Sequence, residues 1–102
     1  MKYNKLVRDK IPDIIKQKSQ IPVTHIADNK EYQQKLKEKL KEEVDEFLKD
    51  GNQEELADIL EVIYTICDSK NINKEELEQL RKTKAEKRGQ FKKKIILDEV
   101  KE

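Results

Sequence analysis

One stretch constrains the fold most, because it joins two helix-forming segments through the turn residues Asp50, Gly51 and Asn52. Apolar residues recur three and four positions apart on both sides of this turn, the spacing that places them on one face of an α-helix. Gly51 suits the position just past a helix end, because glycine adopts a left-handed backbone at little cost. The stretch from Lys41 to Glu61 therefore predicts a helical hairpin whose two faces fold toward each other.

The same spacing predicts helices elsewhere in the chain. A first helix should follow Asp9 as its N-cap, with Pro12 tolerated in the first turn. The other expected helices are 30–49 (capped by Asp28 or Asn29), 53–69, and 74–89 (capped by Asn73). Their expected buried residues are Leu36, Leu40, Val44, Phe47 and Leu48; then Leu56, Ile59, Leu60, Val62, Ile63, Ile66 and Cys67; then Leu77, Leu80 and Ala85. Ile95, Ile96 and Leu97 would form a short strand or a packed tail.

We therefore predict an all-α fold, a four-helix bundle that forms a single domain over residues 1–102. Its N-terminal segment should be irregular or β-like, and a tail should follow the last helix. Only 34% of the residues are apolar, a thin core for a free monomer of this length, which favours a homodimer or homotetramer.

Charge and composition narrow the function classes. The chain carries 23 basic and 22 acidic residues, so it lacks the basic excess of a general nucleic-acid binder. No apolar run approaches the about 20 residues that span a bilayer, and the N-terminus has no signal-peptide core. A single cysteine, Cys67, fits a reducing compartment. We expect a soluble, cytoplasmic protein with neither nucleic-acid nor membrane partners.

Four carboxylates flank the turn in two pairs, Glu43 with Glu46 and Glu55 with Asp58. Residues three apart share a helical face. Glu55 falls inside the apolar arc of its helix and Asp58 at the edge, where a carboxylate is costly unless it is paired or bound to a metal. Four converging carboxylates would bind Mg²⁺ or Mn²⁺, which prefer oxygen ligands. The alternative is ordinary helix-start charge, since acidic groups are favoured in a first turn.

Two basic clusters are candidates for binding phosphate. Without the carboxylates they would indicate only a solvated segment and a helix end that complements the helix dipole. The chain has no glycine-rich phosphate loop, which excludes a P-loop mechanism. The clusters are Lys5, Arg8 and Lys10 near the N-terminus, and Lys84, Lys87 and Arg88 on one face of the last expected helix.

These motifs resemble a known family. The sequences EEVDE at 42–46 and ELAD at 55–58 resemble the EExxE…ExxD signature of the all-α nucleoside triphosphate pyrophosphohydrolases, which include MazG-like proteins and phosphoribosyl-ATP pyrophosphohydrolase. YNKLVRDKIP at 3–12 resembles the start of a small, single-domain MazG-like subgroup of house-cleaning pyrophosphatases. KRGQF at 87–91 resembles that subgroup's KRGGF segment, with Gln90 in place of a second glycine. The similarity runs from residue 3 to residue 97, although the hairpin is tighter than in many relatives.

The resemblance implies hydrolysis of a nucleoside triphosphate between its α and β phosphorus atoms, giving a monophosphate and pyrophosphate. It implies that the four carboxylates hold Mg²⁺, with Glu42 or Glu61 as further ligands, and that both basic clusters bind phosphate oxygens. Asn4 and Asp9 would position the base, the sugar or the basic side chains. Two alternatives stay open. The substrate could be phosphoribosyl-ATP, or the chain could be a non-catalytic helical interaction module.

Overall fold

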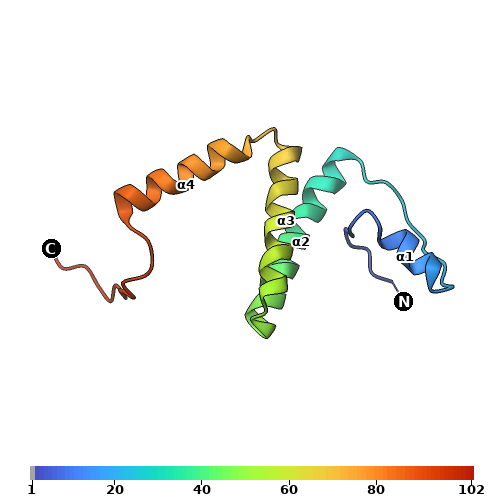
Figure 1. Ribbon diagram of the computed structural model, residues 1–102, viewed down its shortest axis with the longest axis horizontal. Helices are drawn as coiled ribbons and strands as arrows, with labels where there is room; N and C mark the ends of the chain where they lie inside the picture. Colours follow the sequence, from blue (N-terminus) through green and yellow to red (C-terminus); the bar gives the residue numbers. More distant parts are fainter. Residues whose placement is uncertain (1) are drawn as a thin grey trace. The chain divides into compact units, whose positions relative to one another are not determined.

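The computed structural model describes residues 2–102, which form four helices and no strand (Figure 1). The all-α prediction is confirmed, and the N-terminal segment is irregular rather than β-like. The three longer helices begin and end within one residue of their expected bounds. The helices are α1 (Ile11–Gln17), α2 (Asn29–Asp50), α3 (Gln53–Ser69) and α4 (Lys74–Arg88).

Side-chain caps mark the starts of α2 and α4, and a glycine marks the end of α2. The Asp28 carboxylate accepts a hydrogen bond from the Glu31 N–H at 2.8 Å and caps α2. The Asn73 side chain accepts from the backbone N–H of Glu75 at 2.8 Å and caps α4. Gly51 ends α2 in the left-handed conformation, with φ at 68°. These three signals can be read from the sequence because each acts within one helical turn.

The prediction that Asp9 caps α1 is wrong. The cap position is Lys10, whose side chain makes no capping hydrogen bond. A backbone turn replaces the side-chain cap, since the Ile11 N–H donates to the carbonyl of Arg8 at 3.0 Å. Pro12 lies in the first turn of α1, where its missing N–H costs nothing.

The described chain divides into two compact units, the first ending at Ile66 and the second beginning at Cys67. The first unit holds the N-terminal segment, α1, α2 and most of α3. The second holds the end of α3, then α4 and the tail. The single domain over residues 1–102 stays a prediction. No helix within the described residues is long and apolar enough to cross a membrane.

The core of the first unit lies between α2 and α3, which run side by side as an antiparallel hairpin (Figure 1). Leu36 is 1% exposed, and Val62 is also buried. Leu40 and Phe47 are half-buried, as predicted for the inner face of α2. The prediction is wrong for Leu48, which is 75% exposed, because the apolar stripe of α2 is wider than one partner helix can cover.

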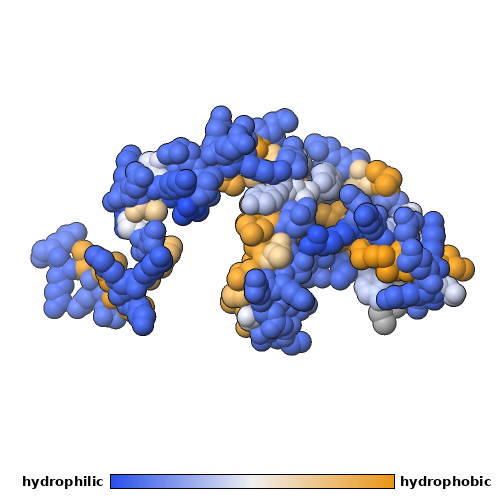
Figure 2. Space-filling view, viewed as in Figure 1, coloured by the Kyte–Doolittle hydropathy of each residue, from blue (hydrophilic) through white to orange (hydrophobic). Residues whose placement is uncertain are grey.

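A second apolar surface of the hairpin is open to solvent. At about 100° per residue, its members fall on the flank of the hairpin opposite the one that carries Glu42 and Asp58. Figure 2 shows apolar side chains along the visible face of α3. We call this surface the apolar flank, which consists of the exposed residues Val44, Leu48, Leu56, Leu60 and Tyr64. Burial was expected for its leucines and for Val44, so those expectations are wrong for the single chain.

The second unit has little core of its own. On α4, Leu77 and Ala85 are half-buried, whereas Leu80 is exposed, against the prediction. The tail from Ile95 to Leu97 is exposed and forms no strand, so neither expected form of it is present. Charged residues dominate this unit and leave few apolar side chains to pack.

Candidate metal and phosphate site

Three carboxylates come together at the closed end of the α2–α3 hairpin. Glu46, Asp50 and Glu55 each bring one oxygen within 4.8 Å of the other two. Glu46 and Asp50 are four residues apart and share a face of α2. The turn at Gly51 then returns Glu55, in the first turn of α3, to that face. We call these three residues the carboxylate cluster.

Asp50 is not among the ligands expected from the sequence, which indicates that it belongs to the turn. The structure makes it the last residue of α2. The signal that would have found it is its spacing of four from Glu46, one turn further along the same helical face.

Glu55 is the least solvated member of the carboxylate cluster. Its Oε2 atom is buried and has no hydrogen-bond partner within the part of the chain that the structure describes. Leaving such an acceptor unsatisfied costs about 1–3 kcal/mol. A bound cation would offset that cost, so the donor set fits a hard divalent ion.

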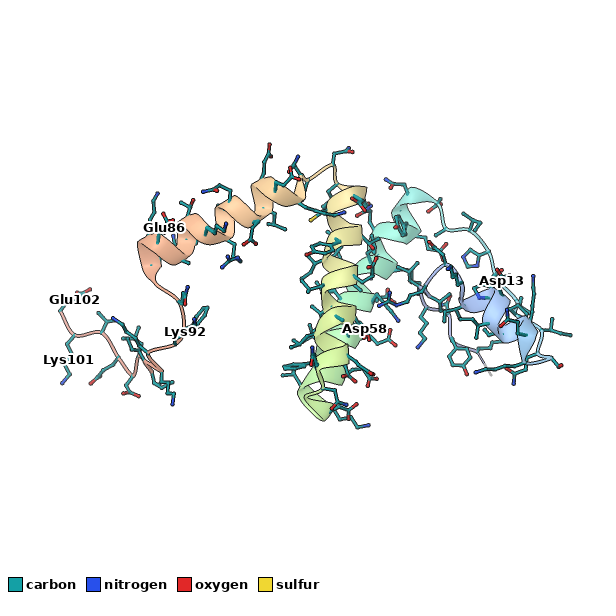
Figure 3. All side chains as sticks on the ribbon, viewed as in Figure 1. Asp13, Asp58, Glu86, Lys92, Lys101 and Glu102 are labelled. Carbon is teal, nitrogen blue, oxygen red and sulfur yellow. The ribbon has the colours of Figure 1, made fainter. Side chains whose placement is uncertain are left out.

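The other two predicted ligands, Glu43 and Asp58, lie outside the carboxylate cluster and are paired with cations. Glu43 is mostly shielded, with 13% of its side chain exposed, and lies 3.2 Å from the Lys39 Nζ. Asp58 projects from α3 toward the N-terminal segment (Figure 3). It accepts a hydrogen bond from an Arg8 guanidinium nitrogen at 2.6 Å. Glu43 is three residues from Glu46, and Asp58 is three residues from Glu55, so each lies within one helical turn of a member of the carboxylate cluster.

Glu42 links the N-terminal segment to α2. Its carboxylate accepts hydrogen bonds from Lys5 at 2.9 Å and from Lys39 at 3.1 Å. Partial burial alone would raise the pKa of Glu42, but the hydrogen bonds from the two lysines outweigh it, and the net pKa is lowered. The same hydrogen bond to Glu42 raises the pKa of Lys5. The pair therefore stays ionised across the neutral range.

The remaining predicted residues of the first unit make weaker contributions. Glu61 is exposed on α3, and its backbone carbonyl accepts a hydrogen bond from Thr65. Asp9 and Lys10 are exposed at the start of α1. Asn4 contributes its backbone carbonyl, which accepts a hydrogen bond from Lys35 at 2.8 Å.

The C-terminal basic cluster belongs to the second unit. Lys84, Lys87 and Arg88 are exposed near the end of α4, where positive charge complements the helix dipole. Gly89, which follows, has a positive φ of 83°. A role for these three residues in phosphate binding stays a prediction.

The first unit thus carries a carboxylate cluster and, within about one helical turn of its members along α2 and α3, ion pairs of Glu42, Glu43 and Asp58 with basic side chains. Comparisons of the chain with protein-family models, curated proteins and solved structures found no match. The function proposed below therefore depends on the residues and contacts of this chain.

Proposed function

We propose that this protein is a Mg²⁺-dependent nucleoside triphosphate pyrophosphohydrolase. It would hydrolyse the bond between the α and β phosphorus atoms of a ribo- or deoxyribonucleotide, canonical or modified, and release a monophosphate and pyrophosphate. One observation carries the proposal. The carboxylate cluster, with its unsatisfied Glu55 oxygen, lies on the same two helices as Glu42 and Asp58, which are within about one turn of a cluster residue and pair with Lys5 and Arg8 of the N-terminal segment.

In this proposal the acidic residues bind the cation and the basic residues bind the phosphates. Glu46, Asp50 and Glu55 would hold Mg²⁺ or Mn²⁺ through one oxygen each. The bound ion would neutralise the triphosphate and lower the pKa of the attacking water. Arg8 can bind a phosphate through two parallel hydrogen bonds, whereas Lys5 acts as a point charge.

The ion pairs of the free protein support this division. In the free protein, Arg8 pairs with Asp58 and Lys5 pairs with Glu42, and phosphate oxygens would take the place of those carboxylates when a nucleotide binds. Both pairs are partly exposed, so an incoming anion can reach them. Such pairs contribute only about 0–1 kcal/mol to folding, and exchanging one partner costs little.

The test is the release of pyrophosphate from a panel of ribo- and deoxyribonucleoside triphosphates with Mg²⁺ or Mn²⁺. Glu46→Gln and Glu55→Gln should abolish release. The matched control is Asp45→Asn on the outer face of α2, where Asp45 is paired with Lys41 at 2.6 Å, and it should retain activity. The proposal is wrong if no nucleotide yields pyrophosphate, or if both glutamine variants keep the activity of the wild type.

Two alternatives share parts of the evidence. Phosphoribosyl-ATP would use the same metal chemistry, so adding it to the panel distinguishes the substrates. A non-catalytic helical module predicts no thermal stabilisation by Mg²⁺ with a nucleotide, whereas a binding site raises the melting temperature by mass action. The proposal includes a cytoplasmic location, where nucleoside triphosphates are made and used.

We also propose that a second copy of this chain covers the apolar flank. Leu56, Leu60 and Tyr64 recur four residues apart on α3, and Leu60 is 48% exposed, so a helical pair from another copy could pack along this row. Sedimentation equilibrium should show a dimer or tetramer, and Leu60→Lys should shift it to a monomer. A wild-type protein that stays monomeric at high concentration would contradict self-association.

A further inference from the structure

A small pocket lies between the N-terminal segment and α2, wholly within the first unit. Its volume is about 240 Å³. That is below the about 300–1,000 Å³ of sites that enclose a drug-sized ligand, so it has room for one ring of a nucleotide but not for the whole molecule. Four residues of each element line it, Tyr3, Asn4, Lys5 and Leu6 from the segment and Lys35, Glu38, Lys39 and Glu42 from α2.

The lining combines apolar surface with hydrogen-bonding groups. The Tyr3 ring and the Leu6 side chain offer apolar surface, and the Lys5 ammonium lies 5.7 Å from the centre of the Tyr3 ring. Glu38 offers carboxylate oxygens, and hydrogen bonds donated by Gln34 and Lys35 lower its pKa, so it stays ionised. A planar ring with polar edge atoms matches this combination, because its face can stack on tyrosine while its edge accepts or donates hydrogen bonds.

The pocket wall is held in shape by a specific contact. Asn4 has a left-handed backbone, with φ at 47°, a conformation that asparagine tolerates better than most residues. The Lys35 Nζ donates to the Asn4 carbonyl at 2.8 Å and so ties this turn to α2. Lys5, one residue further on, is tied to the same helix through Glu42. In the free protein, Tyr3 therefore directly precedes a segment that is anchored to α2 at two successive positions, Asn4 and Lys5.

The pocket and the carboxylate cluster lie in register along one side of α2. At about 1.5 Å per residue, Glu38 is about 12 Å and Lys35 about 16 Å along the helix from Glu46. Glu42, which pairs with Lys5, lies between Glu38 and Glu46 on the helix. One row along the helix carries this order, with spacings of four, three, four and four, and its members are Lys35, Lys39, Glu42, Glu46 and Asp50.

That order is the order of groups in an extended nucleotide, with a ring at one end, phosphates in the middle and the metal on the phosphates. We propose that this pocket binds the nucleobase of the triphosphate substrate, stacked on Tyr3, with Lys5 contacting the phosphates at the pocket edge. The inference rests on the proposed function and adds a base-binding subsite to it. The N-terminal segment then selects the substrate as well as neutralising it.

The experiment compares a ligand that has a base with one that has none. Binding of Mg²⁺–nucleoside triphosphate and of Mg²⁺–tripolyphosphate to the full chain is measured by calorimetry. The base should make the nucleotide bind about 5–150-fold more tightly than tripolyphosphate. Tyr3→Ala should remove this preference and leave tripolyphosphate binding unchanged. Tyr3→Phe, which keeps the ring, should retain it, and because Tyr3 is exposed, both variants should fold.

The outcomes separate this inference from the proposed function. If Tyr3→Ala keeps the wild-type preference while nucleotides still yield pyrophosphate, the pocket does not bind the base, and the proposed enzymatic activity is retained. If tripolyphosphate binds as tightly as every nucleotide in the wild type, the pocket is also wrong. If neither ligand binds and no nucleotide is hydrolysed, both proposals are overturned.

Discussion

Replacing Glu55 by glutamine should stabilise the protein in the absence of metal and remove its response to Mg²⁺. Glu55 has a buried oxygen with no hydrogen-bond partner among the described residues. Glutamine keeps the shape of the side chain but removes the charge, which is the costly part of the buried group. A residue that lowers the stability of the fold is expected at a binding site. The gain in stability and the loss of the Mg²⁺ response should therefore occur in the same variant.

The magnitude follows from the position of Glu55. Desolvating an unpaired polar group costs about 1–3 kcal/mol, and more when the group is charged. Glutamine keeps a polar amide at this position and removes only the charged part of that cost, and the residue is only half-buried, so the lower end applies. Removing negative charge from the first turn of α3 costs about 0.3–1 kcal/mol in the opposite direction. Glu54→Gln is the matched control, since Glu54 is exposed in the same turn and loses the same dipole interaction. Glu55→Gln should therefore be about 1 kcal/mol more stable than Glu54→Gln.

Thermal unfolding with EDTA and then with a Mg²⁺ titration measures both effects. A difference of 1 kcal/mol shifts the melting temperature by about 4–8 °C in a domain of this size. At 100 times its dissociation constant, Mg²⁺ should stabilise the wild type and Glu54→Gln by about 2.7 kcal/mol, and Glu55→Gln hardly at all. The reasoning is refuted if Glu55→Gln melts below Glu54→Gln in EDTA, or if Mg²⁺ stabilises it as much as the wild type.

Three further predictions concern the carboxylate cluster, the N-terminal segment and the core. Asp50→Asn should weaken Mg²⁺ binding in calorimetry, while Asp45→Asn on the outer face leaves it unchanged; equal affinities would remove Asp50 from the site. Glu42 has a lowered pKa, so its pair with Lys5 stabilises the fold above the ordinary glutamate value of 4.5 and is lost as the pH falls through the lowered pKa. Lys5 has a raised pKa, so the same contribution is present below 10.5 and is lost as the pH rises through the raised value. Urea unfolding across this range should show a plateau, and Glu42→Gln should lower it by about 0.2–1 kcal/mol, the size of an exposed pair; an unchanged plateau would contradict the pairing. Leu36→Ala should cost about 2–5 kcal/mol in the same assay, because this side chain is fully buried, and a cost below 1 kcal/mol would contradict its central place in the core.

The helices were predictable because their signals are local. Asp28, Gly51 and Asn73 each act within one turn of the helix end they mark, and helical spacing depends on neighbours three and four residues away. The α1 cap was missed because two competing groups lie side by side. The sequence offers Asp9, but the backbone turn from Arg8 to Ile11 satisfies the same donor.

The composition of the site was only partly predictable. A helical wheel places Glu55 inside the apolar arc of α3 but Glu46 outside the apolar stripe of α2, and the structure brings both into the carboxylate cluster. The helical wheel cannot show which further carboxylate joins Glu46 and Glu55, since that depends on how the turn positions α3 along α2. Asp50 joins because α2 continues to the turn itself, whereas Asp58 is drawn to Arg8, fifty residues away in the sequence.

The sequence by itself determined four helices, most of their ends, and an acidic hairpin between two basic segments. These features follow from periodicity, capping and composition, which need no knowledge of distant contacts. Only the tertiary structure decided which carboxylates meet, which carboxylates pair with Lys5 and Arg8 of the N-terminal segment, and that a pocket forms beside Tyr3. The physical reason is that ion pairs such as Lys5–Glu42 and Arg8–Asp58 are individually weak. Their pairing is therefore set by the packed backbone that presents them and not by the residues alone.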